Sequence, residues 1–311
     1  MSSSPIRIAT RASRLALWQA NHVAKLLRKA APDRAVEIVH ISTAGDRDKT
    51  ESLAGLGGQG IFTREVQHAV LDGRTDLAVH SLKDLPTEPA GGLVLAAVPK
   101  RTAMFDVLVL PQHADAQSGL DSLPEAARVG TGSPRRQAQL LHLRDDLQLL
   151  EVRGNVETRI KKLDAGQYDA LVLAEAGLRR LGLQSRISAV LRPPTMYPAV
   201  GQGALGLECR TEDEELRSLL QRIGDPITQS AITAERSLLA ALRAGCHAPV
   251  GVETTVAGDQ LTLEAVVLSS DGRERLTATG TLAAFQAEML GKQLAADLQR
   301  QGAAVLINPG T

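Results

Sequence analysis

The 311-residue chain has few aromatic residues: three phenylalanines, two tyrosines and one tryptophan make up 2% of it. Lysine and arginine together number 35, as do aspartate and glutamate, so the formal net charge is zero. Proteins that bind nucleic acid usually carry a basic excess and aromatic side chains on which bases stack. The composition therefore argues against nucleic acid as a partner, and any basic surface must be local.

Cysteine is also scarce, since only Cys209 and Cys246 occur. Two such cysteines form no disulfide framework and no zinc-binding spacing, so each has to be explained singly. Cys209 alternates with Leu205 and Leu207 as in a half-buried strand, which predicts a core position. Cys246 follows Gly245, a residue typical of a helix end, and is expected on an exposed connection. By position alone, such a cysteine is more often inert than reactive.

Long apolar runs are missing as well. No stretch approaches the roughly 20 apolar residues of a membrane-spanning helix, and residues 1–8 lack the apolar core of a signal peptide. We therefore expect a cytoplasmic protein that has no membrane contact. With 43% hydrophobic residues, a chain of this length can form two or three domains with their own cores.

Short apolar stretches alternate with helical patterns along most of the chain, which is typical of an α/β protein. Residues 6–10 form the first predicted strand, and Ser13 can cap a helix that ends before Pro32. Further strands are predicted at residues 36–41, 77–79, 93–98, 107–110, 147–152 and 170–174.

From Asp225 onward the pattern changes to one helix, three antiparallel strands and a closing helix, which predicts a small α+β domain. The strands are predicted at residues 250–256, 261–268 and 273–281, with a turn at residues 258–259. The apolar stripe of the closing helix is Phe285, Met289, Leu294 and Leu298. Together with proline-marked crossovers near residues 99 and 193, this predicts three domains: residues 1–99 with 197–222, residues 100–196, and residues 223–311.

Lys83 and Asp84 directly follow the predicted strand at residues 77–79, and Pro86 fixes the turn after them. Ligands of open α/β sheets bind at the carboxyl ends of strands. A carboxylate beside an ammonium group suits a reaction in which positive charge develops on an anionic substrate. Taken alone, the pair is better explained as solvated charges that cap a strand.

Cationic side chains recur at other strand ends and helix starts. The helix dipole disfavours cations at a helix start unless an anion lies between them, and arginine binds carboxylates in bidentate fashion. A single case would be a solvated charge, but several at equivalent strand ends indicate an anionic ligand. The cations are Arg11, Arg14, Arg135, Arg136, Arg153, Arg159, Arg179 and Arg180, and the cap residues Ser13 and Ser133 lie beside them in the sequence.

Two glycine-rich segments complete the set of candidates. Residues 42–60 form a long polar connection, and we interpret it as a flexible flap because connections longer than about 12–15 residues are usually functional or disordered. Gln202 stands among Gly201, Gly203 and Gly206, and these glycines allow a ligand to approach the backbone closely.

Five motifs in this chain resemble those of the porphobilinogen deaminase family, also called hydroxymethylbilane synthases. They occur in register between residues 6 and 252, at residues 77–86, 129–136, 152–159, 198–203 and 244–246. Gly132 and Pro134 depart from the family's usual Ser-Ser-Leu-Arg-Arg, which puts one secondary carboxylate contact in doubt.

The resemblance implies two α/β domains like those of type II periplasmic binding proteins, which form a cleft, and a small C-terminal α+β domain. It implies a monomeric transferase of porphyrin and haem biosynthesis. A dipyrromethane cofactor would be attached to Cys246 through a thioether, and no metal would be needed. Four porphobilinogen molecules would be added to it head to tail with loss of ammonia, and hydrolysis would release hydroxymethylbilane.

The resemblance also implies a role for each candidate residue. Asp84 would be the catalytic acid that interacts with pyrrole nitrogens and stabilises cationic intermediates. The cofactor would be bound by Asp84, Lys83, Ser133, Arg135 and Arg136. Acetate and propionate groups of the substrate would be bound by Arg11, Ser13, Arg153, Arg159, Arg180 and Gln202.

Two other classes of protein remain as alternatives. A solute-binding protein would share a two-lobed body with an arginine-lined cleft, but it would need export and would have no use for Asp84 or Cys246. A sensor of an anionic metabolite would bind its ligand without turnover and would carry no covalent pyrrole.

Overall fold

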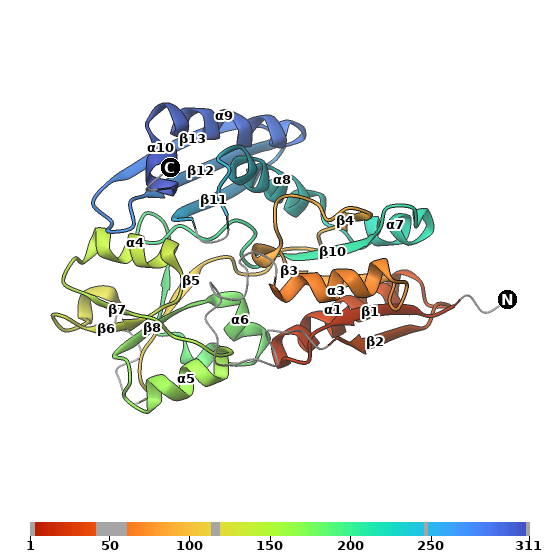
Figure 1. The fold of residues 1–311 in the computed structure, drawn as a ribbon, viewed down its shortest axis with the longest axis horizontal. Helices are drawn as coiled ribbons and strands as arrows, with labels where there is room; N and C mark the ends of the chain where they lie inside the picture. The colour runs from red at the N-terminus through yellow and green to blue at the C-terminus, as the bar shows by residue number, and fades with distance from the viewer. Residues whose placement is uncertain (1–3, 42–60, 113–118, 246–247, 309–311) are drawn as a thin grey trace. The chain divides into compact units, whose positions relative to one another are not determined.

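The structure is a computed structural model that describes residues 4–41, 61–112, 119–245 and 248–308. The predicted flap at residues 42–60 and Cys246 lie outside the described residues. The chain divides into two compact units, Met1–Arg101 with Ala204–Gln229 and Thr102–Gly203 with Ser230–Thr311. Each unit contains a five-stranded sheet, and the second also contains a three-stranded sheet (Figure 1). The predicted α/β class is confirmed, whereas the division into three domains stays a prediction.

The sheet of the first unit has the strand order β2-β1-β3-β10-β4. Its strands are β1 Ile6–Thr10, β2 Val36–His40, β3 Leu77–Ser81, β4 Leu93–Ala97 and β10 Leu205–Arg210. Strands β2, β1 and β3 are parallel, while β10 runs antiparallel between β3 and β4 (Figure 1). A strand with neighbours on both sides, in a sheet covered on both faces, can bury residues of both faces, and Leu205–Cys209 are all buried. The half-buried strand predicted from alternation is therefore wrong, but the core position of Cys209, which is 0% exposed, is confirmed.

Helices cover both faces of this sheet because neighbouring strand residues point to opposite sides. Ile8 packs in a core with α1 (Arg14–Ala30) and α7 (Glu214–Gln221). Its neighbour Ala9 packs in a second core with α3 (Ile61–Leu71).

The sheet of the second unit repeats this arrangement with the order β7-β6-β8-β5-β9. Its strands are β5 Asp106–Val109, β6 Arg128–Gly130, β7 Gln148–Leu150, β8 Ala170–Ala174 and β9 Ala189–Leu191. Strands β7, β6 and β8 are parallel, and β5 is antiparallel to β8 and β9. The helices that follow strands in this unit are α4 Pro134–Leu143, α5 Val156–Asp164 and α6 Glu175–Arg180.

The C-terminal sheet consists of β11 Val250–Ala257, β12 Gln260–Leu268 and β13 Arg275–Ala283, all antiparallel. The predicted turn at residues 258–259 is confirmed, since Ala257 pairs with Gln260. Helices α8 (Pro226–Ala241), α9 (Ala287–Arg300) and α10 (Ala303–Ile307) contribute to its core.

The predicted apolar stripe of the closing helix is partly wrong. Phe285 is 89% exposed because it lies in the 3₁₀ turn before α9, and Met289 is 41% exposed. The buried face of α9 is formed instead by residues at helical spacing from Ala287: Leu290, Leu294 and Leu298.

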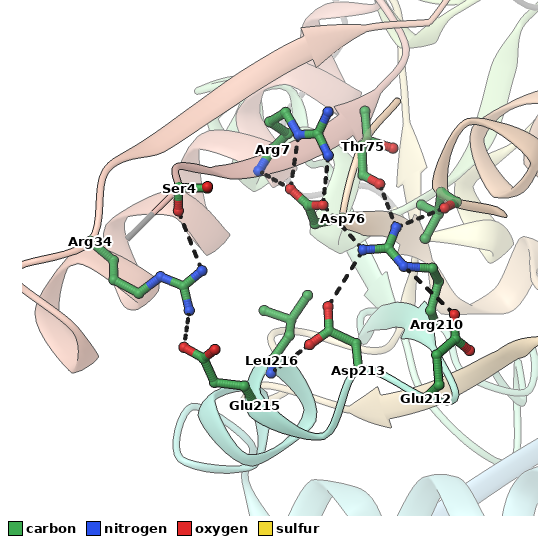
Figure 2. Close-up of polar contacts among 11 residues, drawn as sticks. Ser4, Arg7, Arg34, Thr75, Asp76, Arg210, Glu212, Asp213, Glu215 and Leu216 are labelled. Atoms are coloured by element: carbon green, nitrogen blue, oxygen red, sulfur yellow. Dashed lines mark hydrogen bonds and ion pairs between the residues drawn. The ribbon is translucent and has the colours of Figure 1, made fainter. Parts of the chain in front are cut away.

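Charged side chains connect three strands at the edge of the first sheet where β1 and β3 begin (Figure 2). Arg7 on β1 donates to Asp76 through its backbone nitrogen at 2.9 Å and its Nη2 at 2.8 Å. Arg210 on β10 donates to Asp76 Oδ1 at 3.2 Å, and its Nη1 donates to the carbonyls of Val70 and Thr75. Burial of Asp76 opposes ionisation, but the hydrogen bonds from the two arginines outweigh it and lower the pKa of that carboxyl.

We expect Asp76→Asn to destabilise the protein by about 2 kcal/mol at neutral pH, because it weakens several charge-assisted hydrogen bonds. A carboxyl with a lowered folded-state pKa contributes stability that is fully present above about pH 4, its unfolded pKa, and is lost as the pH falls through the folded value. Urea unfolding from pH 7 to pH 3 should therefore show the two proteins converging below pH 4. A stability difference that stayed constant over this range would contradict the role of the Asp76 charge.

Candidate functional site

The first group of predicted site residues lies at one edge of the first sheet. Because β1 and β3 are parallel neighbours, their carboxyl ends meet at this edge. Arg11 and Ser13 follow β1, and Ser13 caps α1 by accepting a hydrogen bond from the Ala16 nitrogen at 3.3 Å. Lys83 and Asp84 follow β3 in the 3₁₀ helix η1, Leu82–Asp84, where Asp84 is exposed and Lys83 is partly buried.

The turn that carries Asp84 is held by its apolar neighbours. Leu82 and Leu85 are 1% and 4% exposed, and both side chains lie within 4 Å of the position that a Cβ atom on Gly206 of β10 would occupy. A Cβ atom on Gly206 would lie 2.6 Å from Leu82 Cδ1, so a larger residue there would displace the turn. The Leu82 nitrogen also donates to the Ala204 carbonyl at 3.1 Å. The exposed carboxylate of Asp84 is thus presented by a firmly anchored turn.

A buried polar pair that the sequence reasoning missed lies in the strands beside this turn. His80 Nε2 and Glu208 Oε2 are 3.0 Å apart, and both side chains are 4% exposed. Gln67 on α3 donates to the same Glu208 oxygen at 2.8 Å. The sequence could have indicated this pair, since His80 and Glu208 each interrupt a mainly apolar strand and buried polar groups require partners.

The second group of site residues lies at the carboxyl edge of β7, β6 and β8 in the second sheet. Ser133 is the N-cap residue of α4 and Pro134 occupies its first turn, as predicted. The Ser133 side chain makes no capping hydrogen bond within the described structure, so its hydroxyl is not used by the helix. Arg135 and Arg136 follow in the same turn and are only 4% and 6% exposed.

Both arginines contact one buried carboxylate, that of Asp106 at the start of β5. Arg135 Nη1 lies 2.8 Å from Asp106 Oδ2, and Arg136 Nη2 lies 2.7 Å from Oδ1. Arg136 Nε also donates to Oδ1 at 2.9 Å, and its Nη1 donates to the Val172 carbonyl at 2.9 Å. Asp106 is 0% exposed, so this is a desolvated charge cluster. Burial and the charge of Arg136 lower the pKa of Arg135, although the charge of Asp106 raises it.

Gln202 and Arg180 are also held in the second unit. Gln202 is 1% exposed, and its Nε2 donates to Asp106 Oδ1 at 3.0 Å and to the Met104 carbonyl at 2.8 Å. Arg180 Nη2 donates to the Gly203 carbonyl at 2.7 Å and to Thr102 Oγ1 at 3.2 Å. Burial lowers the pKa of Arg180 to about 10, so the guanidinium stays protonated at neutral pH. Through its hydrogen bond to Asp106, Gln202 belongs to the same cluster as Arg135 and Arg136.

Arg153 and Arg159 are more accessible than the arginines around Asp106. The Arg153 side chain is 42% exposed, and its Nε lies 2.8 Å from Glu151 Oε1. Arg159 on α5 is partly buried, and its Nε donates to the Gly154 carbonyl at 2.8 Å.

The structure thus brings Arg135, Arg136 and Gln202 together around Asp106, which the sequence reasoning did not single out. The sequence could have indicated Asp106, because its carboxylate stands at the start of an apolar strand, two residues before the buried run Leu108–Leu110. Among the residues that the structure describes, no group of three or more His, Cys, Asp or Glu is arranged to hold a metal ion. Within the same ranges, no helix is both long and apolar enough to cross a membrane.

Comparison with known proteins gives matches to two family models and to curated relatives. Residues 6–218 match the family described as porphobilinogen deaminase, dipyromethane cofactor binding domain, and residues 230–300 match its C-terminal domain. The porphobilinogen deaminase of Syntrophotalea carbinolica is 46% identical over 97% of this chain and 95% of its own length. That of Maridesulfovibrio salexigens is 44% identical over 97% of both chains. Among solved structures, the periplasmic aliphatic sulphonate binding protein of Escherichia coli is 13% identical with a TM-score of 0.39, covering 78% of this chain and 76% of its own.

Proposed function

Since this chain belongs to the porphobilinogen deaminase family, we propose that it is a transferase that joins four porphobilinogen molecules head to tail on a covalently bound dipyrromethane. Each addition releases ammonia, and hydrolysis finally releases hydroxymethylbilane, a precursor of porphyrins and haem. As part of the same proposal, the protein acts as a cytoplasmic monomer. The observation that carries the proposal is the concentration of guanidinium groups at the carboxyl edge of β7, β6 and β8.

The cofactor is dipyrromethane, since residues 6–218 match the domain of the family that binds it. The residues present fit such a group. Arg135 and Arg136 share one carboxylate, and the Arg135 Nε is buried without a hydrogen-bond partner among the described residues. Buried donors and excess positive charge suit a ligand that carries several carboxylates. When bound, the dipyrromethane supplies the pyrrole carbon to which the first porphobilinogen is joined.

Within this proposal, each set of side chains has one task. Cys246 holds the cofactor covalently, while Lys83, Ser133, Arg135 and Arg136 bind its acetate and propionate groups. The substrate carboxylates are bound by Arg11, Ser13, Arg153, Arg159 and Arg180. Gln202 was predicted to bind substrate, but its hydrogen bond to Asp106 supports an indirect role.

Asp84 supplies the negative charge for the reaction. Positive charge develops on a porphobilinogen when its ammonia leaves, and a nearby carboxylate stabilises that charge. Asp84 is exposed on the anchored turn after β3, which supports this role.

Incubation of the purified protein with porphobilinogen tests this function. We expect one ammonia released for each porphobilinogen consumed, and four porphobilinogens consumed for each hydroxymethylbilane formed. A solute-binding protein or a sensor would bind porphobilinogen without releasing ammonia. That result would favour the alternatives and exclude the transferase.

Replacing Arg159 by leucine should slow chain elongation by about tenfold to a hundredfold at one particular step, because a charge-assisted contact to a carboxylate is worth about 1.5–3 kcal/mol. Mass spectra of the enzyme during turnover should show one intermediate accumulating. Lys161→Leu is the control, since it removes an exposed positive charge from the same helix. Equal distributions of intermediates in wild type and Arg159→Leu would contradict a separate clamp at Arg159.

A further inference from the structure

Asp106 is the one carboxylate around which the predicted cofactor-binding arginines converge in the described part of the second unit. Its place in the fold follows from strand direction. Strand β5 is antiparallel to β8, and Asp106 at its start pairs with Ala174 at the end of β8. The amino end of β5 therefore lies at the same edge as the carboxyl ends of the three parallel strands, where ligands bind in α/β sheets.

The two oxygens of Asp106 are divided between the two guanidinium groups. Oδ2 contacts Arg135, while Oδ1 accepts hydrogen bonds from Arg136 and from Gln202. Backbone carbonyls complete the arrangement, since Arg135 donates to Tyr197 and Arg136 donates to Val172. Arg136 is held through all three of its guanidinium nitrogens, and Arg135 is held through Nη1, which contacts both Asp106 and the Tyr197 carbonyl. These contacts restrict the orientation of the remaining donors.

We propose that Asp106 is a positioning residue: it orients Arg135 and Arg136 toward the carboxylates of the covalently bound dipyrromethane without touching the cofactor itself. This inference rests on the proposed function. Two arginines that share one carboxylate keep one positive charge for the ligand, and the buried Nε of Arg135 is a donor without a partner in the described structure. Binding geometry depends on such supporting contacts, since a misplacement of 1 Å can cost about a hundredfold in rate.

The variant Asp106→Asn distinguishes a positioning role of Asp106 from simple neutralisation of the arginine charges. The asparagine keeps the shape, but its amide nitrogen would face a guanidinium donor, so one arginine would lose its acceptor. Positioning predicts that the cofactor is acquired about tenfold to a hundredfold more slowly. If Asp106 only neutralised charge, the variant would present more positive charge to an anionic ligand and would acquire the cofactor at least as fast as wild type.

The experiment starts from full-length protein produced in cells that cannot make porphobilinogen. Porphobilinogen is added, and intact mass is followed over time to give the rate at which the covalent cofactor appears. Thermal unfolding is measured before and after loading, because a ligand bound to the folded state raises the midpoint. A purely structural role would lower both midpoints equally, whereas positioning also reduces the rise on loading.

Asp169→Asn is the matched control, because Asp169 forms a similar bidentate pair with Arg128 in the same unit at 2.8 Å but is 34% exposed. We expect it to load like wild type. Gln202→Met is a second test variant that keeps the Asp106 charge and removes one of its donors. Gln202→Met should acquire the cofactor several-fold more slowly than wild type. If Asp106→Asn does not fold, this variant tests the positioning role in its place.

Two outcomes would overturn the inference in different ways. Wild-type protein that gains no mass would remove the proposed function and this inference with it. If wild type loads normally and the folded Asp106→Asn protein does too, the positioning role alone is overturned. Where Asp106→Asn does not fold, normal loading of Gln202→Met has the same consequence.

Discussion

Asp84→Asn should lower the turnover number by about 100- to 1,000-fold while the protein keeps its fold and its covalent cofactor. This is the usual effect of removing one electrostatic contact to charge that develops in a transition state. Asparagine keeps the shape of aspartate and loses its charge. Since Asp84 is exposed and the turn is anchored by the buried Leu82 and Leu85, we expect the free energy of unfolding to change little.

The measurement for this variant is single-turnover ammonia release by protein that already carries the cofactor, so that chemistry is separated from loading. Glu88→Gln is the control, because Glu88 is another exposed carboxylate in the same connection. The control should retain wild-type turnover. If Asp84→Asn turned over at more than about half the wild-type rate, Asp84 would have no part in stabilising the reaction.

Cys246→Ala should abolish covalent cofactor attachment and activity completely, whereas Cys209→Ala should keep both. Cys209 is 0% exposed in β10, and burial raises the pKa of its thiol to about 11. The thiolate is the nucleophilic form of cysteine, so Cys209 is inert at neutral pH. Cys246, the other cysteine of the chain, is the proposed attachment residue.

Intact-mass measurement of the purified proteins checks this prediction. Wild type and Cys209→Ala should carry an excess equal to two linked pyrrole units, and Cys246→Ala should have the mass of its unmodified sequence. Cys246→Ala should also unfold at lower temperature than loaded wild type, because the bound anionic cofactor stabilises the folded state by linkage. Active wild-type protein with an unmodified mass would contradict attachment at any cysteine.

The buried cluster around Asp106 gives a physical reason to expect that cofactor loading stabilises the protein. Arg135 is desolvated, and the cost of burying its charge is offset only partly by one shared carboxylate. Anionic groups bound beside it would add the missing negative charge. The protein without its cofactor should therefore be the less stable form.

Local features of this protein were determined by the sequence alone. The alternation of apolar strands and helical stripes predicts the α/β class, and Ser13 and Ser133 mark helix starts that the structure confirms. The position of Lys83 and Asp84 after β3 follows from the apolar run that ends before them. These features depend on neighbouring residues, whose periodicity and capping chemistry are visible within a few positions.

Other features were decided by tertiary structure, because they depend on contacts between residues far apart in the chain. Nothing within residues 205–210 indicates that β10 lies between β3 and β4, so its burial on both faces was missed. The partners of Arg135 and Arg136 were likewise not predictable, because Asp106 reaches them only through the antiparallel direction of β5. A charged residue acts as ligand contact, support or solvated surface according to what is buried beside it, and burial is set by the packing of the whole sheet.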